Sequence, residues 1–189
     1  MSEQNKAKTA NRGVHYYAEI IRQIVIFAML GSLMFVSKIF LEILPNIHLL
    51  GMFTMLYTVV YRAKALIPIY VFVMLTGLYA GFAPWWVPYL YIWTMLWAVT
   101  MLLPKKMKPK VANIVYPAVC CLHGVLFGVL YAPGQALLYG FDLKTTIAWI
   151  ASGFWWDIVH GVGNLFAATL VYPLSVILIK LERISQKQF

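Results

Sequence analysis

Long apolar runs make up most of this chain, and short polar turns separate them. A transmembrane helix needs about 20 mostly apolar residues. Six segments meet or approach this requirement, and they cover approximately residues 22–44, 46–61, 65–83, 85–103, 111–131 and 154–179. The pattern therefore predicts an all-α membrane protein, built as a bundle of about six transmembrane helices.

Proline marks the end of several of these segments. Pro45 follows the first, Pro84 the third and Pro104 the fourth, as expected because proline disrupts a helix interior. The longest predicted connection covers residues 132–153, and its second half has the pattern of a helix. Together with the last segment, this helix is too long for one straight crossing. We therefore expect a bend at Gly153.

The composition agrees with a membrane protein. Only 11% of the residues are charged and 62% are hydrophobic, whereas soluble domains carry about 25% charged residues. The net charge of +9 does not indicate nucleic-acid binding, because the basic residues lie in short clusters between apolar runs. The adjacent Cys120 and Cys121 fit no metal or redox spacing, and we expect them to be packing residues.

Lysine and arginine fall almost entirely on one side of the predicted bundle. With six crossings, only Lys38 and Lys144 of the 15 basic residues face the side opposite the two ends. Because cytoplasmic loops are rich in Lys and Arg, we expect both termini in the cytoplasm. Residues 1–21 are then a cytoplasmic leader, 22–180 the transmembrane domain and 181–189 a cytoplasmic tail.

Polar residues on the last predicted segment share one helix face. Asp157, His160 and Asn164 stand at positions i, i+3 and i+7, a spacing that aligns side chains. Ionisable residues within a membrane span are costly and usually mark function. Two interpretations stay open: the face lines a substrate-binding site, or an Asp–His pair locks this helix to a neighbour.

Two other segments offer side chains at a matching depth. His123 and Tyr131 share a face of the fifth segment, and Tyr89 and Trp93 share a face of the fourth. Aromatic walls with a few converging polar groups are typical of small-molecule sites. We predict no catalytic residue and no metal ligand. The predicted substrate-binding residues are Asp157, His160, Asn164, His123, Trp93, Tyr89, Trp156 and Tyr131.

Two residue pairs near the outer surface have alternative interpretations. Lys38 and Glu42 either belong to the site or form an i, i+4 ion pair at the membrane surface. Trp85 and Trp86 either line the site or belong to the aromatic belt at the membrane–water interface.

The first segment carries a patch of small residues, Ala28, Gly31 and Ser32. Small side chains allow two helix backbones to approach closely. The patch packs either within this chain or against a partner protein, and we favour a partner.

In these features the chain resembles the substrate-binding S components of energy-coupling factor (ECF) transporters, a family of vitamin importers. The resemblance covers nearly the whole length. It rests on the number of segments, the small-residue patch, the Pro45-Asn46 turn, the stretch from His123 to Gly128, and the face formed by Asp157, His160 and Asn164.

The resemblance implies a function and partners. The chain would be the high-affinity substrate-binding subunit of an ATP-driven importer in a bacterial plasma membrane, and it would not be an enzyme. Through the patch in the first segment it would join a transmembrane coupling protein and two ATPase subunits. Family members have an Ala-x-x-x-Ala pattern there, and Ser32 departs from it. Metal-transporting members carry a His near the amino terminus, where this chain has Met1-Ser2-Glu3, so the resemblance implies no metal substrate.

The chain has no phosphate-binding loop of the Gly-Lys-Ser or Gly-Lys-Thr type, which is the motif that holds ATP in many transporters. ATP would then be used by the partner subunits, and no cofactor is expected in this chain. The outer half has no Arg, which disfavours a multiply anionic ligand. Its Trp, Tyr, His and Asn residues suit a flat, neutral or weakly cationic heteroaromatic ring, such as a thiamine precursor, a pyridoxine-like vitamer or a modified base.

Two other functions stay open. An intramembrane enzyme could use Asp157 and His160 for acid–base chemistry, with His123 as a third group. Alternatively, a stand-alone carrier could couple uptake to protons, although such carriers often show inverted repeats that this chain lacks.

Overall fold

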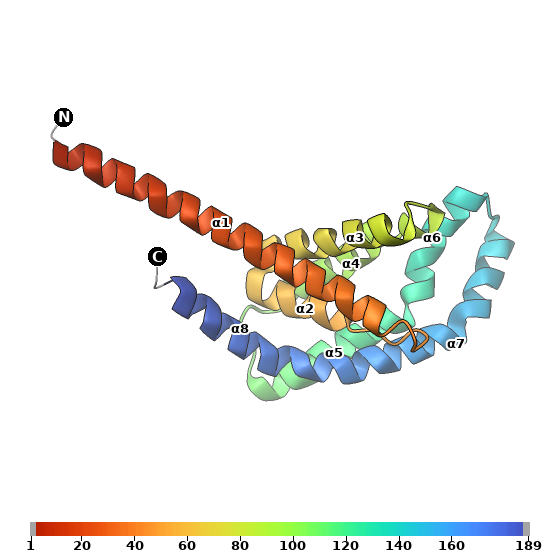
Figure 1. Cartoon of the computed structure of the whole chain (residues 1–189). Helices are drawn as coiled ribbons and strands as arrows, with labels where there is room; N and C mark the ends of the chain where they lie inside the picture. The colour runs from red at the N-terminus through yellow and green to blue at the C-terminus, as the bar shows by residue number, and fades with distance from the viewer. Residues whose placement is uncertain (1–2, 187–189) are drawn as a thin grey trace.

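The computed structural model describes the backbone of residues 3–186 and the side chains of residues 16–186. This part of the chain is helical and holds no strand. The helices are α1 (Glu3–Phe40), α2 (Leu50–Tyr61), α3 (Leu66–Ala80), α4 (Tyr89–Leu102), α5 (Pro109–Val125), α6 (Phe127–Tyr139), α7 (Leu143–Ala167) and α8 (Val171–Gln186). Figure 1 shows the helices as a bundle in which the start of α1 and the end of α8 lie on the same side.

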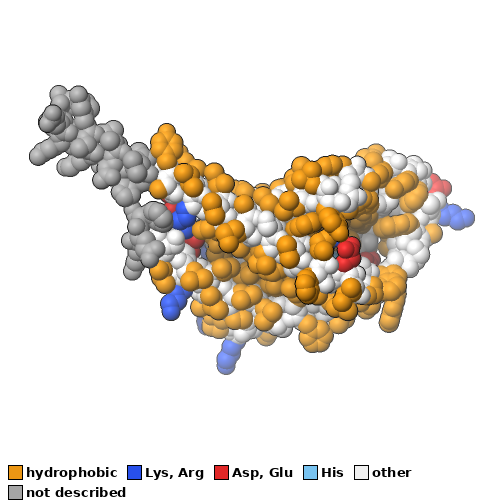
Figure 2. All heavy atoms as spheres, in the orientation of Figure 1, with side chains coloured by type: hydrophobic (Ala, Val, Ile, Leu, Met, Phe, Trp, Pro, Cys, Tyr) orange, Lys and Arg blue, Asp and Glu red, His pale blue; other side chains and the backbone are white. Residues whose placement is uncertain are grey.

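Four helical segments are long and apolar enough to cross a membrane: Tyr16–Phe40, Leu50–Ala80, Pro109–Tyr139 and Leu143–Gln186. On the face shown in Figure 2, hydrophobic side chains cover the middle of the molecule, and the charged side chains gather toward its two ends. The all-helical architecture with membrane-length apolar helices is therefore confirmed. The number of six crossings and the side on which the termini lie stay predictions.

The apolar segment Leu50–Ala80 turns back on itself between α2 and α3. Arg62, between α2 and α3, has a φ of 55°, in the left-handed region that non-glycine residues rarely adopt. The Tyr57 hydroxyl of α2 donates to the Leu30 carbonyl of α1 at 3.1 Å, whereas Phe35 of α1 contacts Tyr79 of α3 with ring centroids 5.6 Å apart. Farther along α2, the Tyr61 ring lies 5.2 Å from the Phe27 ring of α1, measured between centroids, and Val71 of α3 lies beside Gly31 of α1. Helix α2 is therefore antiparallel to α1, and α3 is parallel to it.

Residues 132–139, which we expected in a loop, belong to helix α6, and the connection before α7 shrinks to residues 140–142. The loop prediction was wrong because Pro133 stands inside the helix. Tyr91 of α4 supports the helix at this point. Gly134 N–H donates to the Tyr91 hydroxyl at 3.2 Å, and that hydroxyl donates to the Leu130 carbonyl at 2.9 Å. In a regular helix Gly134 would bond Leu130 directly, so Tyr91 bridges the two.

We expect Tyr91→Phe to lower the free energy of unfolding by about 1–2 kcal/mol, because two hydrogen bonds are lost and the groups they satisfied stay in place. Unfolding of the purified protein in detergent measures the change. Tyr79→Phe is the matched control, since Tyr79 is 63% exposed. Equal stability of Tyr91→Phe and the wild type would show that the hydroxyl does not support α6.

Helix α7 continues through Gly153, where we expected a bend. Figure 1 shows that α7 changes direction along its length while staying helical. The helical pattern tightens only after Ala167, in the short 3-10 turn Ala168–Leu170 that leads into α8. At the start of α7, the Asp142 carboxylate accepts a hydrogen bond from Thr145 N–H at 2.7 Å. This N-cap, chiefly through Thr145, lowers the pKa of Asp142.

An ion-pair network joins the first and the last helix of the bundle. The Arg22 guanidinium of α1 lies 2.8 Å from the Glu19 carboxylate and 2.6 Å from the Glu182 carboxylate of α8. It also donates to the Ser185 hydroxyl at 3.2 Å. Only 8% of the Arg22 side chain is exposed, so the pair is largely shielded and holds α1 beside α8.

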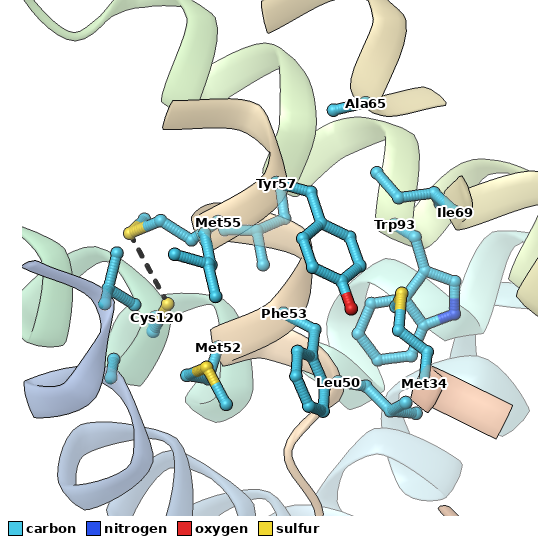
Figure 3. Close-up of a cluster of buried hydrophobic side chains, with 14 of the residues drawn as sticks. Met34, Leu50, Met52, Phe53, Met55, Tyr57, Ala65, Ile69, Trp93 and Cys120 are labelled. Carbon is cyan, nitrogen blue, oxygen red and sulfur yellow. Dashed lines mark hydrogen bonds between the residues drawn. The ribbon is translucent and has the colours of Figure 1, made fainter. Parts of the chain in front are cut away.

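Helix α2 is buried over most of its length, because every residue from Leu50 to Thr58 is buried. Figure 3 shows side chains from several helices meeting there, among them Met34, Tyr57 and Trp93, all of which are almost fully buried. Cys120 is buried and free, and its sulfur lies 3.7 Å from the Met55 sulfur. Cys120 therefore serves as a packing residue, as the sequence indicates.

Candidate ligand-binding site

Four helices bring aromatic and imidazole rings into one group. Trp93 of α4 lies 5.8 Å from His123 of α5 and 6.0 Å from Phe127 of α6, measured between ring centroids. His160 of α7 lies 4.8 Å from Phe127. Trp93, His123 and His160 were predicted to meet, and the structure brings them together around Phe127.

The sequence interpretation missed His48. It stands in the connection between α1 and α2, and its ring lies 4.4 Å from His160 and 6.0 Å from Trp93. The Pro45-Asn46 turn just before it was the available signal, since Asn46 adopts a φ of 57° and the turn brings the chain back over the bundle. We call His48, Trp93, His123, Phe127 and His160 the ring cluster.

The polar side chains of this region are buried without full hydrogen bonding. Trp93 and Asn164 are 0% exposed, His160 3% and His123 7%. Most buried polar atoms in proteins have a partner, and each exception calls for an explanation. The buried side-chain atoms here that have no protein partner are Trp93 Nε1, Asn164 Oδ1, His48 Nδ1, His123 Nδ1 and His160 Nε2.

Asn164 lies on α7, one helical turn after His160. Its amide nitrogen donates to the Cys120 carbonyl of α5 at 3.3 Å. Two glycines leave the space for it: a Cβ on Gly51 would lie 3.0 Å from the Asn164 amide, and a Cβ on Gly124 would lie 2.9 Å from it. The amide therefore occupies a seam between α2, α5 and α7.

Asp157 has a partner outside the ring cluster. Its carboxylate accepts a hydrogen bond from Gly128 N–H at 3.1 Å. Gly128 is the second residue of α6, which starts after the irregular Leu126, so its N–H lacks an intrahelical partner. Asp157 thus caps α6, and a Cβ on Gly128 would collide with the carboxylate. This contact ties α7 to α6.

The remaining predicted residues border the ring cluster unequally. Measured between ring centroids, Tyr89 lies 5.9 Å from Trp93 and Tyr131 lies 5.8 Å from Phe127. The Tyr131 ring also stacks on Trp149, with centroids 6.0 Å apart. Trp156, in contrast, is 47% exposed on α7.

The paired residues with two interpretations now have defined contacts. The Lys38 ammonium lies 3.8 Å from the Glu42 carboxylate, as an i, i+4 pair. Trp86 donates its indole N–H to the Val73 carbonyl at 2.8 Å, and the Trp85 ring lies 5.6 Å from Tyr89. Both tryptophans therefore contact neighbouring helices in addition to any contact with lipid.

Two hollows reach the ring cluster from its flanks. One, of about 570 Å³, lies beside His48 and is bordered by Ile47, Trp155 and Val159 of the connection and α7. The other, of about 380 Å³, lies beside His123 between α4 and α5. The rings themselves pack against one another, so a ligand must displace part of the cluster. His48 is the one member of the ring cluster that stands outside a helix.

The three histidines do not form a metal-ligand set. Among residues 16–186, no group of three His, Cys, Asp or Glu side chains is arranged to hold a metal ion. The site therefore offers hydrogen bonds and aromatic surface.

The burial of His48 makes the stability of the folded protein depend on pH. Burial lowers the pKa of His48 from its ordinary value of 6.5 to about 4. In the unfolded chain the ring regains its ordinary pKa. Protons therefore favour the unfolded chain as the pH falls from about 6.5 to about 4, and this contribution to the stability of the fold is fully present above that range.

We expect the unfolding temperature of the wild type to fall, relative to that of His48→Gln, between about pH 7.5 and about pH 5. Glutamine keeps hydrogen-bonding atoms but takes up no proton. Thermal unfolding of both proteins at the two pH values gives the comparison. A difference that does not change with pH would contradict the burial of a neutral His48.

The fold and the ring cluster define a coarse class: an all-helical protein with membrane-length apolar helices and a buried group of aromatic and polar side chains. No protein-family model, no curated protein and no solved structure matches this chain.

Proposed function

We propose that this chain is the membrane-embedded substrate-binding subunit of an ECF-type importer for a vitamin or a related small heteroaromatic micronutrient. In this proposal the chain crosses a bacterial plasma membrane six times, with both termini in the cytoplasm. A transmembrane coupling protein and two ATPase subunits supply the energy, and this chain binds the ligand.

The observation that carries the proposal is the ring cluster with its unpartnered atoms. Leaving a buried donor or acceptor unpaired costs about 1–3 kcal/mol. Four nearly buried residues, Trp93, His123, His160 and Asn164, each hold such an atom in one region. Sites that bind polar ligands need such groups free in the empty state, and aromatic walls around a few polar atoms are typical of them.

The distribution of charge supports the proposed orientation. Lys64 of the α2–α3 turn donates to Gln23 of α1 at 2.8 Å, and Arg22 pairs with Glu182. These basic residues therefore lie at the end of the bundle that holds the chain termini. The ring cluster lies toward the opposite end, beside the α1–α2 connection. A basic cytoplasmic end leaves the cluster in the outer half, where an importer meets its substrate.

The small-residue patch is the proposed contact for the coupling protein. Gly31 is buried against α3, because a Cβ there would lie 2.6 Å from Val71 Cβ and 2.7 Å from the Pro68 carbonyl oxygen. Ala28 and Ser32 are exposed on α1. The partner would therefore contact Ala28 and Ser32, while Gly31 holds α1 against α3 within this chain.

Uptake measurements test the proposal. Cells express the chain with or without a coupling protein and its two ATPase subunits, and receive a uniformly ¹³C-labelled growth extract. We expect a labelled heteroaromatic compound to accumulate, unchanged, only when all components are present. Accumulation without the ATPase subunits would indicate a stand-alone carrier. Conversion of a labelled compound by the purified chain would indicate an enzyme.

A further inference from the structure

The unpartnered atoms of the ring cluster differ in the hydrogen bonds that they can make, and this difference restricts the ligand. An indole N–H can only donate, so Trp93 Nε1 requires an acceptor. Asn164 already donates through its amide nitrogen to the Cys120 carbonyl, so its free Oδ1 is an acceptor and requires a donor.

His123 is fixed in the same way. Its Nε2 lies 3.2 Å from the Ile92 carbonyl oxygen, and a carbonyl can only accept, so Nε2 carries the proton. The ring is enclosed by Trp93 and Phe127, where a charged imidazolium would be costly. In the neutral ring with Nε2 protonated, the unpartnered Nδ1 is an acceptor. His160 Nε2 and His48 Nδ1 have no bond that fixes their tautomers.

We infer that the ligand is a neutral nitrogen heteroaromatic that carries at least two N–H donors and one acceptor, such as an amino-substituted or carboxamide-substituted pyridine or pyrimidine. This inference rests on the proposed function. The donors pair with His123 Nδ1 and Asn164 Oδ1, and the acceptor pairs with Trp93 Nε1. A carboxylate or phosphate brings only acceptors, so it would place lone pairs against those of His123 and Asn164 and gain no cation in return.

Matched pairs of compounds test this assignment on the full chain in lipid nanodiscs. Each pair exchanges a carboxamide for a carboxylate of similar shape: nicotinamide against nicotinate, and pyrimidine-4-carboxamide against pyrimidine-4-carboxylate. We expect calorimetry to show the donor-bearing member binding at least about 100-fold more tightly, since a site built for hydrogen bonds strongly rejects a ligand that leaves them unmade. His123→Phe should reduce this affinity at least tenfold (about 1.4 kcal/mol), and His123→Gln, which retains an acceptor, should restore part of it.

Nitrogen NMR of ¹⁵N-histidine-labelled protein supplies a measurement that needs no ligand. His123→Phe identifies the His123 signals, and we expect Nε2 protonated and Nδ1 bare. A protonated Nδ1, or tighter binding of the carboxylate members, would overturn the inference, and carboxylate binding that His123→Phe weakens would leave the proposed function standing. Absence of binding by both series at millimolar concentration would overturn both.

Discussion

Replacing Gly124 by Ala will strongly destabilise the protein, with an expected loss of about 1–3 kcal/mol, the range for overpacking a closely packed seam. A Cβ on Gly124 would lie 2.7 Å from Gly161 Cα and 2.8 Å from Gly161 N. These are backbone atoms, which cannot rotate away as a flexible side chain can. Helix α5 must therefore move from α7, and this movement also disturbs the Asn164 amide between them.

Gly153→Ala is the matched control for this change. Gly153 lies within α7, and a Cβ there would meet nothing within 4 Å. Alanine is favoured over glycine in a helix by about 0.5–1 kcal/mol, so this variant should be as stable as the wild type or more stable. Unfolding of both variants in the same detergent gives the comparison. A Gly124→Ala protein as stable as Gly153→Ala would contradict the close crossing of α5 and α7.

Replacing His160 by Phe will strongly weaken ligand binding while leaving the fold intact. Phenylalanine keeps the aromatic contacts with Phe127 and His48 but removes the unpartnered Nε2 atom. Since an unsatisfied buried polar atom is destabilising, the variant should be as stable as the wild type or more stable by about 1 kcal/mol. Affinity for the ligand should fall at least about 100-fold, because the site loses a group it holds ready for binding.

This pair of readouts separates the two interpretations of His160. A histidine that only locks α7 to its neighbours would, when replaced, lower stability. A histidine kept free for a ligand lowers affinity and not stability, the usual exchange between function and stability at binding sites. Phe154→Leu is the control on the same helix, since Phe154 is 53% exposed and borders neither hollow. Lower stability of His160→Phe with unchanged binding would assign His160 to packing.

Helical character and part of the site could be predicted because they depend on local pattern. The apolar runs predict the helices, and the i, i+3, i+7 spacing of Asp157, His160 and Asn164 places them on one face of α7. The meeting of Trp93, His123 and His160 followed from their similar depth in neighbouring segments. These inferences needed only the period of a helix and the thickness of a membrane.

The features that the sequence did not predict depend on contacts between distant segments. His48 joins the ring cluster only because the chain turns back at Asn46 and lays one side chain over α7. Helix α6 passes Pro133 because Tyr91, about 40 residues earlier, bridges Gly134 and Leu130. Asp157 caps α6 because α5 ends at an irregular Leu126. The spacing of residues along the sequence does not reveal any of these contacts.

Mass spectrometry of the equilibrated protein shows whether the ring cluster holds a small molecule. Wild type, His160→Phe and Phe154→Leu are dialysed in nanodiscs against the same labelled extract, washed and denatured, and the released compounds are identified. We expect a nitrogen heteroaromatic to be released by the wild type and by Phe154→Leu and to be absent from His160→Phe. The same compounds in equal amounts from all three proteins would contradict this expectation.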